Sequence, residues 1–297
     1  MQEEPMKLNH ASLMQNHPCF SKEAHGKRGR IHLPVAPACN IQCRYCLRKY
    51  DCANESRPGV TSVVLSPSEA LERVRNLVER DLRLGVIGIA GPGDPLANEA
   101  TFETMRAVNR EFPHLILCIS TNGLALNDRI DDLMKSGVRS VTITINASRP
   151  EIAEKVYKWV IYRGRKYDGR EAAELLLANQ WSGLINAIEA GFLIKVNSVL
   201  IPGVNDKEIT LVAEKAGEAG ADIHNIIPLN PQAEFSHVKR PSREDIHLLR
   251  LECGVSIPQM SHCRQCRADA CGTLDDNKDM ESEVLAARIG EEYEMMN

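Results

Sequence analysis

Short apolar runs alternate along the chain with longer stretches in which apolar residues recur at helical spacing. The stretch after Ser66 is one of these, with an apolar face formed by Leu71, Val74, Leu77 and Val78. It begins with Ser66-Pro67-Ser68-Glu69, in which the first serine can cap the helix and the glutamate can complete a capping box. The pattern predicts a helix that starts directly after Ser66.

Six such strand-and-helix units follow one another. Buried strands are predicted at 31–36, 86–90, 115–120, 140–145, 193–200 and 223–227. Helices are predicted at 66–85, 99–112, 128–136 and 171–190, after Asn205, and at 242–252, with an insert rich in Tyr, Lys and Arg at 157–170. The alternation predicts an α/β fold with a parallel sheet covered by helices. In such folds the working face lies where the strands end.

Composition narrows the function classes. The 297 residues are 43% hydrophobic and 26% charged, which is typical of a soluble globular protein. The net charge of −4 argues against a general nucleic-acid binder, which carries a basic excess. No apolar run approaches the ~20 residues of a membrane span, and the N-terminus lacks the order of a secretory signal. We therefore expect a cytoplasmic protein with no nucleic-acid or membrane partner.

Ten cysteines stand out in a chain of this kind, and most lie in two short clusters, at 39–52 and 263–271. Because a reducing cytosol disfavours disulfides, clustered cysteines there more often bind metal or do chemistry. Cys253 is instead expected in the core, and Cys271 is left open between the two roles. Cys118 has burial inside its strand as an alternative.

Cys39, Cys43 and Cys46 form a C-x3-C-x2-C motif on the loop after the first strand. Three thiolates can bind three irons of a 4Fe–4S cluster and leave the fourth open, whereas structural zinc wants four protein ligands. The motif, with the aromatic Tyr45 before its third cysteine, resembles that of the radical S-adenosylmethionine (SAM) superfamily. This resemblance implies a partial TIM-type (β/α)6 barrel with N- and C-terminal extensions, and SAM bound to the open iron.

The same resemblance implies a glycine-rich turn after the second strand that binds the SAM amino group. The turn of residues 91–95, Gly-Pro-Gly-Asp-Pro, occupies that place and departs from the usual Gly-Gly-Glu-Pro. Gly91, Gly93 and Asp94 are therefore the expected SAM-binding residues of this turn. Further SAM contacts are expected from later strand ends, although each could equally cap a helix: Thr121, Asn122, Asn146 and Asn197.

Four blocks together closely resemble a narrower family, the nitrogenase-cofactor maturases called NifB. They are residues 17–21 (His-Pro-Cys-Phe-Ser), 31–37 (Ile-His-Leu-Pro-Val-Ala-Pro), 39–60 and 263–270. Bacterial members often carry an additional C-terminal carrier domain, so the chain resembles the stand-alone, archaeal-type form. The expected division is an N-terminal cluster-ligating extension (1–30), a radical SAM core (31–253) and a C-terminal extension with a C-x2-C motif and an acidic tail (254–297).

The family resemblance implies a lyase-type maturase in nitrogen fixation. Two further 4Fe–4S clusters would be fused, around a carbon from a SAM methyl group and with an added sulfur, into the 8Fe–9S–C precursor of the nitrogenase cofactor. One SAM would donate the methyl group, and another would yield the 5′-deoxyadenosyl radical that takes hydrogen from it. The expected partners are an iron–sulfur cluster donor, a downstream cofactor carrier or scaffold, and a ferredoxin- or flavodoxin-type reductant.

The two substrate clusters need ligands beyond the motif. Cys263 and Cys266 should share one cluster, Cys52 and Cys118 with a histidine could hold the other, and Cys19 could serve either. The histidine is left open between His17 and His25, with His10 and His32 expected to be structural. Glu55 and Arg57 could shuttle protons or hold anionic groups near the clusters, or could form a surface ion pair.

Two other functions are compatible with parts of the pattern. A radical SAM peptide-modifying enzyme could use the C-terminal cysteines for auxiliary clusters, although such tails carry more cysteines than residues 253–271 offer. A non-catalytic iron–sulfur carrier would need neither six strand–helix units nor a SAM-binding turn.

Overall fold

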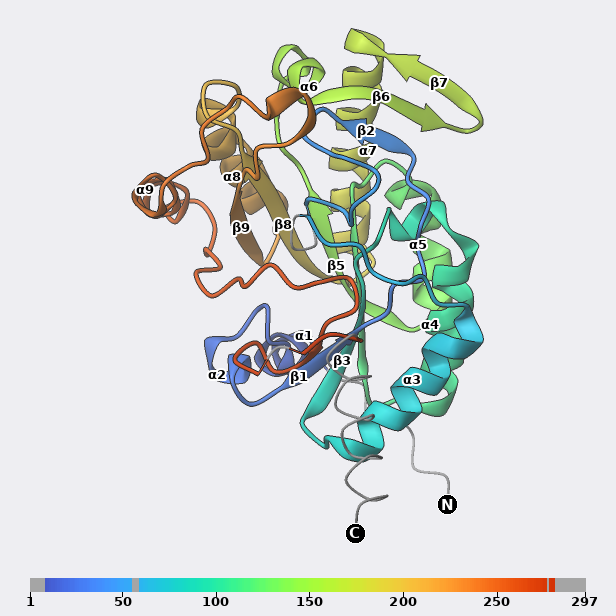
Figure 1. Ribbon diagram of the computed structural model, residues 1–297. Helices are drawn as coiled ribbons and strands as arrows, with labels where there is room; N and C mark the ends of the chain where they lie inside the picture. Colours follow the sequence, from blue (N-terminus) through green and yellow to red (C-terminus); the bar gives the residue numbers. More distant parts are fainter. Residues whose placement is uncertain (1–8, 55–58, 277, 281–297) are drawn as a thin grey trace, which may run out of the picture.

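The computed structural model describes residues 9–54, 59–276 and 278–280. Its main sheet is open and curled, with helices on the outer face (Figure 1). In spatial order the strands are β10 (Cys271–Gly272), β1 (Gly29–His32), β3 (Leu84–Ile89), β4 (Ile116–Thr121), β5 (Val138–Thr144), β8 (Leu193–Leu200) and β9 (Ile223–Pro228). The last six are parallel, and β10 runs antiparallel to β1. The predicted parallel half-barrel is confirmed.

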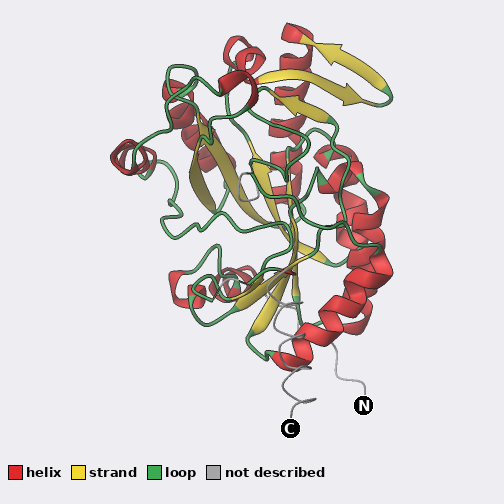
Figure 2. Ribbon diagram, viewed as in Figure 1, coloured by secondary structure: helices red, strands yellow, loops and turns green. Residues whose placement is uncertain are grey.

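Helices follow the sheet strands as the periodicity predicts (Figure 2). The helix after Ser66 has both hydrogen bonds of the capping box, because the Ser66 side chain accepts from the Glu69 amide and the Glu69 carboxylate accepts from Ser66. The longer helices are α3 (Pro67–Arg80), α4 (Glu99–Glu111), α5 (Leu126–Lys135), α7 (Gly169–Glu189), α8 (Asp206–Ala219) and α9 (Arg243–Cys253). The short ones are α1 (His10–Asn16), α2 (Lys22–His25), α6 (Pro150–Val156), η1 (Pro95–Ala97) and η2 (Ala233–Phe235).

Two segments differ from expectation. The first strand ends at His32 and not at residue 36, because Pro34 and Pro37 cannot donate to a sheet. The insert at 157–170 forms a hairpin of β6 (Tyr157–Tyr162) and β7 (Arg165–Asp168). The strand β2 (Ile41–Cys43), which lies in the cysteine loop, pairs with β6. The three strands form a second sheet. Because β2 and β6 are far apart in the sequence, no local sequence pattern predicts that they pair.

The sheet packs an aliphatic core against its outer helices, and Cys253 lies in this core as expected. Successive strand residues point to opposite faces, so every second side chain points into the half-barrel. His32, Gly88 and Cys118 are register partners on the adjacent strands β1, β3 and β4. They therefore lie side by side across the sheet.

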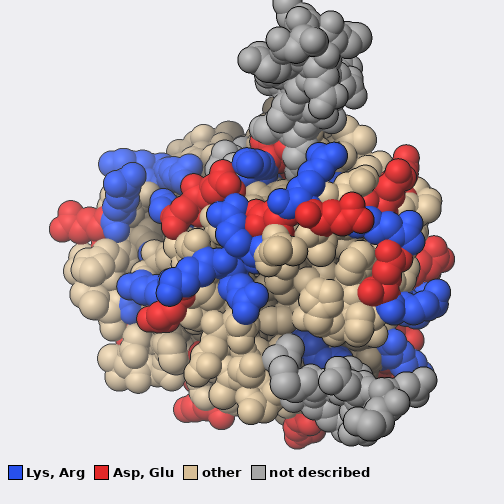
Figure 3. All heavy atoms as spheres, turned by 90° about the horizontal axis from the view of Figure 1, so that it is seen from below, with Lys and Arg blue, Asp and Glu red and all other residues tan. Residues whose placement is uncertain are grey.

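The N-terminal helices α1 and α2 and the C-terminal segment lie together beside β1 (Figure 1). None of the helices in the part of the chain that the structure describes is long and apolar enough to cross a membrane. On the face seen in Figure 3, positive and negative side chains are interspersed.

Candidate active site

The loop after β1 carries Cys39, Cys43 and Cys46, which line one pocket of about 580 Å³. Pairing of β2 with β6 fixes the middle of this loop. Tyr45 is 1% exposed, and its hydroxyl contacts the side chains of Asn54 and Asn146. The contacts of Tyr45 therefore anchor the loop, and its three cysteines border the pocket.

Burial raises the pKa of all three thiols, to about 11 for Cys39. The other two cysteines raise the pKa of Cys43 further, because like charges repel. Bound iron favours the thiolate, so these groups would lose their protons on metal binding. Within the described residues, no three His, Cys, Asp or Glu side chains converge closely enough to hold a single metal ion. Three cysteines around one pocket fit the three-thiolate share of a 4Fe–4S cluster.

Arg48, which was not among the residues predicted from the sequence, secures the same loop. Its guanidinium donates to the backbone carbonyls of Cys39 and Ile41, at 3.2 and 2.5 Å. Its positive charge also lowers the pKa of the Cys39 and Cys46 thiols, against the larger effect of burial. An arginine two residues after the third cysteine was the available signal.

The Gly-Pro-Gly-Asp-Pro turn packs directly on the start of the cysteine loop. A Cβ on Gly93 would lie 2.2 Å from the carbonyl oxygen of Ala38, so this position excludes any side chain. The buried Asp94 carboxylate accepts hydrogen bonds from the amides of Leu96 and Asn122 and from the Thr121 hydroxyl. Burial raises the pKa of Asp94 although these donors oppose the shift. Asp94 therefore ties the turn to the end of β4.

The predicted SAM-binding residues do not all lie in one pocket. Gly93, Asp94 and Asn122 line the first pocket. There the side-chain amide nitrogen of Asn122 donates to the side-chain oxygen of Asn40 at 2.7 Å. Asn197 lines a second pocket. The remaining three border neither pocket: Gly91, Thr121 and Asn146.

The second pocket, of about 640 Å³, gathers thiols that are far apart in the sequence. Cys19, Cys118, Cys263 and Cys266 all line it. Burial raises the pKa of Cys118 to about 12, with Cys19 adding to the rise. Lys195, only 9% exposed, also lines the pocket, and its charge lowers the pKa of Cys19 against the larger effect of burial. This lysine was not among the residues predicted from the sequence, although alternation along β8 places it on the same face as Asn197.

Cys52 lines the first pocket and not the second, so the structure does not bring Cys52 and Cys118 into one pocket. The two pockets adjoin, because Asn54 and Ser120 line both. The candidate catalytic residues Glu55 and Arg57 lie outside the described residues.

The candidate histidines occupy different surroundings. His17 lines the second pocket; its Nδ1 accepts the amide of Cys19 at 3.2 Å, and its buried Nε2 has no hydrogen-bond partner. His25 borders neither pocket, and its Nε2 lies 3.2 Å from the carboxylate of Asp275.

His32, which was expected to be structural, also lines the second pocket. Its Nδ1 lies 2.9 Å from the backbone carbonyl of Arg267. Burial lowers the pKa of both His17 and His32 to about 3.

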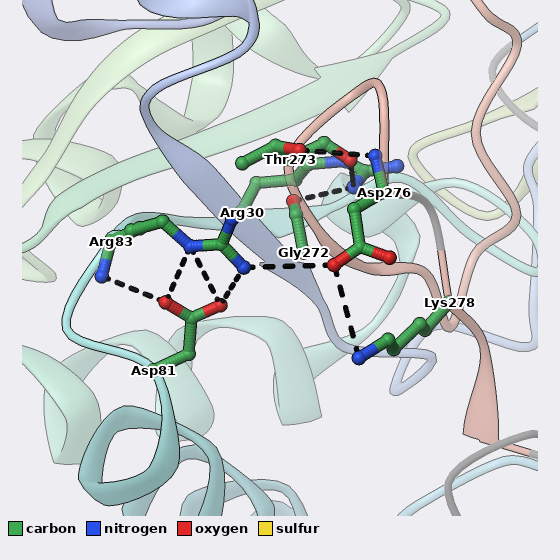
Figure 4. Close-up of polar contacts among 7 residues, drawn as sticks. All are labelled: Arg30, Asp81, Arg83, Gly272, Thr273, Asp276 and Lys278. Carbon is green, nitrogen blue, oxygen red and sulfur yellow. Dashed lines mark hydrogen bonds and ion pairs between the residues drawn. The ribbon is translucent and has the colours of Figure 1, made fainter.

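Polar contacts hold the C-terminal segment against the sheet (Figure 4). Arg30 of β1 donates to the carbonyls of Gly272 and Thr273 at 2.6 and 3.1 Å, and its other terminal nitrogen lies 3.0 Å from the Cys266 sulfur. Arg83 pairs with both Asp81 and Asp276. Cys266 is therefore placed at the pocket by contacts from β1.

Comparisons with known proteins identify the family of this chain and the fold that it shares. The family model of the radical SAM superfamily matches residues 33–216. The FeMo cofactor biosynthesis protein NifB of Methanocaldococcus infernus is 44% identical over 93% of this chain and 91% of its own length. The chain belongs to the NifB family of the radical SAM superfamily. The NifB proteins of Klebsiella pneumoniae and Chlorobaculum tepidum are 48% and 46% identical. The present chain spans 59% of the length of the first relative and 66% of the second. The matched part covers 91% and 94% of the present chain.

Solved structures agree with this family assignment at the level of fold. The Streptococcus suis SuiB structure with its precursor peptide SuiA superposes with a TM-score of 0.56 at 12% identity, over 86% of this chain and 53% of that one. The SAM-bound SuiB structure gives a TM-score of 0.53 at 13% identity, over 74% and 46%. At this identity the likeness concerns the radical SAM half-barrel alone.

Proposed function

We propose that this NifB-family chain is a radical SAM enzyme of nitrogenase cofactor biosynthesis. In this proposal two 4Fe–4S substrate clusters, one SAM-derived carbon and one added sulfur become the 8Fe–9S–C precursor. The observation that carries the proposal is the second pocket. A thiol-lined cavity adjoins the Cys39–Cys46 pocket through Asn54 and Ser120, where substrate clusters would meet the product of SAM cleavage.

The first pocket suits the resident cluster and SAM. Cys39, Cys43 and Cys46 would hold three irons, and the cluster, when bound, supplies one electron to SAM. The turn around Gly93 would offer backbone carbonyls to the SAM amino group. Thr121 and the Asn122 amide hold Asp94, and thus the turn, in place. Asn146 holds Tyr45, with its amide 2.7 Å from the phenol oxygen, and so positions the cysteine loop.

The second pocket suits clusters that must be released. Four cysteines and one imidazole are too few to ligate every iron of two clusters, so each cluster would keep open irons. The buried Lys195 and the guanidinium of Arg30 would offset part of the negative charge of the sulfides and thiolates. In this proposal the segments 1–30 and 254–297 flank the 31–253 core as cluster-binding extensions. The partners proposed are a cluster donor, a cofactor carrier and a ferredoxin- or flavodoxin-type reductant.

Three variants test SAM cleavage separately from the later steps of the proposed reaction. Cys39→Ala, Cys43→Ala and Cys46→Ala should each lose 5′-deoxyadenosine formation when reconstituted protein is incubated with SAM and dithionite. Cys253→Ala is the control, because this cysteine lies in the core away from both pockets. Continued SAM cleavage in a loop variant with intact substrate clusters would contradict the assignment.

A further inference from the structure

A third cavity, of about 1140 Å³, opens beside the second pocket. It is formed by the end of β9, the start of α9 and the C-terminal segment. Cys263 and Gln265 line both this cavity and the second pocket, so the two spaces adjoin at Cys263. The cavity thus offers a route from the surface to one of the pocket thiols.

Three arginines line this cavity, namely Arg240, Arg243 and Arg250, and none of the described residues that line it is acidic. Arg240 and Arg243 are exposed, and neither forms an ion pair with a described residue. The carboxylate of Asp245 is engaged by Ser242 in the capping box of α9. In a chain of net charge −4, this is a local concentration of unpaired positive charge.

Arg250 lines this cavity together with Cys263. One terminal nitrogen donates to the Ile226 carbonyl at 3.1 Å, whereas its buried Nε has no hydrogen-bond partner. Its guanidinium also interacts electrostatically with Cys263. The side chain is therefore held by the Ile226 carbonyl and leaves one buried N–H of its guanidinium without a partner.

We propose that this arginine-lined cavity is the port through which anionic iron–sulfur clusters reach and leave the substrate pocket. The proposal rests on the proposed function in one respect, namely that Cys263 binds a substrate cluster. A 4Fe–4S cluster with thiolate ligands is an anion, and clustered positive charge raises the rate at which anions arrive. Guanidinium suits this role because it is more weakly hydrated than ammonium. On arrival, the Cys263 thiol replaces one thiolate of the cluster, and its proton leaves with that ligand without any change in oxidation state.

The test measures cluster loading into the full-length apoprotein with a synthetic 4Fe–4S thiolate complex, in the absence of SAM. The variant Arg240→Glu/Arg243→Glu should load its Cys263/Cys266 cluster roughly 10-fold more slowly at low salt, since charged clefts change association rates by 10-fold or more. Salt should slow loading of the wild type and should slow the variant less. Arg106→Glu/Arg110→Glu is the matched control, because it makes the same charge change on α4, away from the cavity. The charge-conserving Arg240→Lys/Arg243→Lys should load close to the wild-type rate.

Each of the following outcomes would contradict the proposal that the cavity is a port for clusters. Equal slowing by the α4 pair would show a general charge effect, and unchanged loading in the reversal variant would show that clusters enter elsewhere. If only transfer from a protein donor slows, the arginines bind that protein and not the cluster. Circular dichroism separates misfolding from slow loading, and the single variants Arg240→Gln and Arg243→Gln replace the double variant if it is unfolded. Loading is read without product formation, so failure of the port and failure of the proposed function give different results.

Discussion

The His32 imidazole of β1 and the Cys118 thiol of β4 both lie beside the Cα of Gly88, the residue between them in the sheet register. A Cβ on Gly88 would lie 2.9 Å from His32 Cδ2 and 3.1 Å from the Cys118 sulfur. The absence of a side chain at Gly88 therefore lets both groups border the second pocket.

Gly88→Ala should displace His32, because the added methyl group would lie 2.9 Å from its Cδ2, and should also press on the Cys118 sulfur at 3.1 Å. Overpacking of this kind costs about 1–3 kcal/mol, which should appear as a lower free energy of unfolding in urea. The iron bound beyond the resident cluster should also fall. Gly85→Ala is the control on the same strand, where the nearest atom would be at 3.7 Å. Equal effects of the two substitutions would contradict the packing argument.

The hydrogen bonds of the histidines predict which one ligates a substrate cluster. Since the Nδ1 of His32 lies at a carbonyl oxygen, it carries the proton, and Nε2 keeps the lone pair that iron needs. The Nδ1 of His17 accepts an amide, so its Nε2 carries a proton and would donate to a sulfide. Pulsed electron paramagnetic resonance of the cluster-loaded protein should show a nitrogen coupling that is lost in His32→Ala. The coupling should survive in His17→Ala and His25→Ala, and its loss in either of these but not in His32→Ala would contradict the assignment.

The C-terminal cysteine pair should bind a substrate cluster and not a structural one. Cys263→Ala/Cys266→Ala should retain the cluster of the Cys39 loop and SAM cleavage, but lose about one cluster of iron and sulfide per chain. Cys253→Ala should lose neither. Full iron content in the double variant would show that the pair is not a cluster site.

Glu208 links α8 to the segment after β5 and should make stability depend on pH. Its carboxylate, 1% exposed, accepts the amides of Ser148 and Arg149 and pairs with the Arg149 guanidinium. Burial raises the pKa of Glu208, but these donors outweigh it, and the net shift is downward from the ordinary value of a glutamate. A lowered folded-state pKa means that the contribution is present above the unfolded-state value of about 4.3 and is lost as pH falls through the folded-state value. The wild type should therefore exceed Glu208→Gln in unfolding free energy at neutral pH, and the difference should shrink below about pH 4. A difference that does not change with pH would contradict this.

Local patterns predicted most of the fold and the cysteine loop that borders the first pocket. The helix after Ser66 and the cysteines at 39, 43 and 46 could be predicted because their partners are close in sequence. The second sheet could not, since β2 and β6 are more than 100 residues apart and nothing in either segment specifies the other.

The second pocket was predicted only in part, for the same reason. The family resemblance named Cys19, Cys118, Cys263 and Cys266, which the structure brings together. The pocket positions of His32 and Lys195 were not predicted, because a single polar residue in an apolar strand does not show whether its face is core or cavity. That face is decided by what packs over it, here the N- and C-terminal segments.

The central claim is that a carbon from SAM enters the product made in the second pocket. The direct measurement uses SAM with an isotopically labelled methyl group and anaerobically reconstituted protein supplied with sulfide and reductant. The label should be recovered in the extracted iron–sulfur product of the wild type and be absent from that of Cys263→Ala/Cys266→Ala. A wild-type product free of label, formed while SAM is cleaved, would contradict the account.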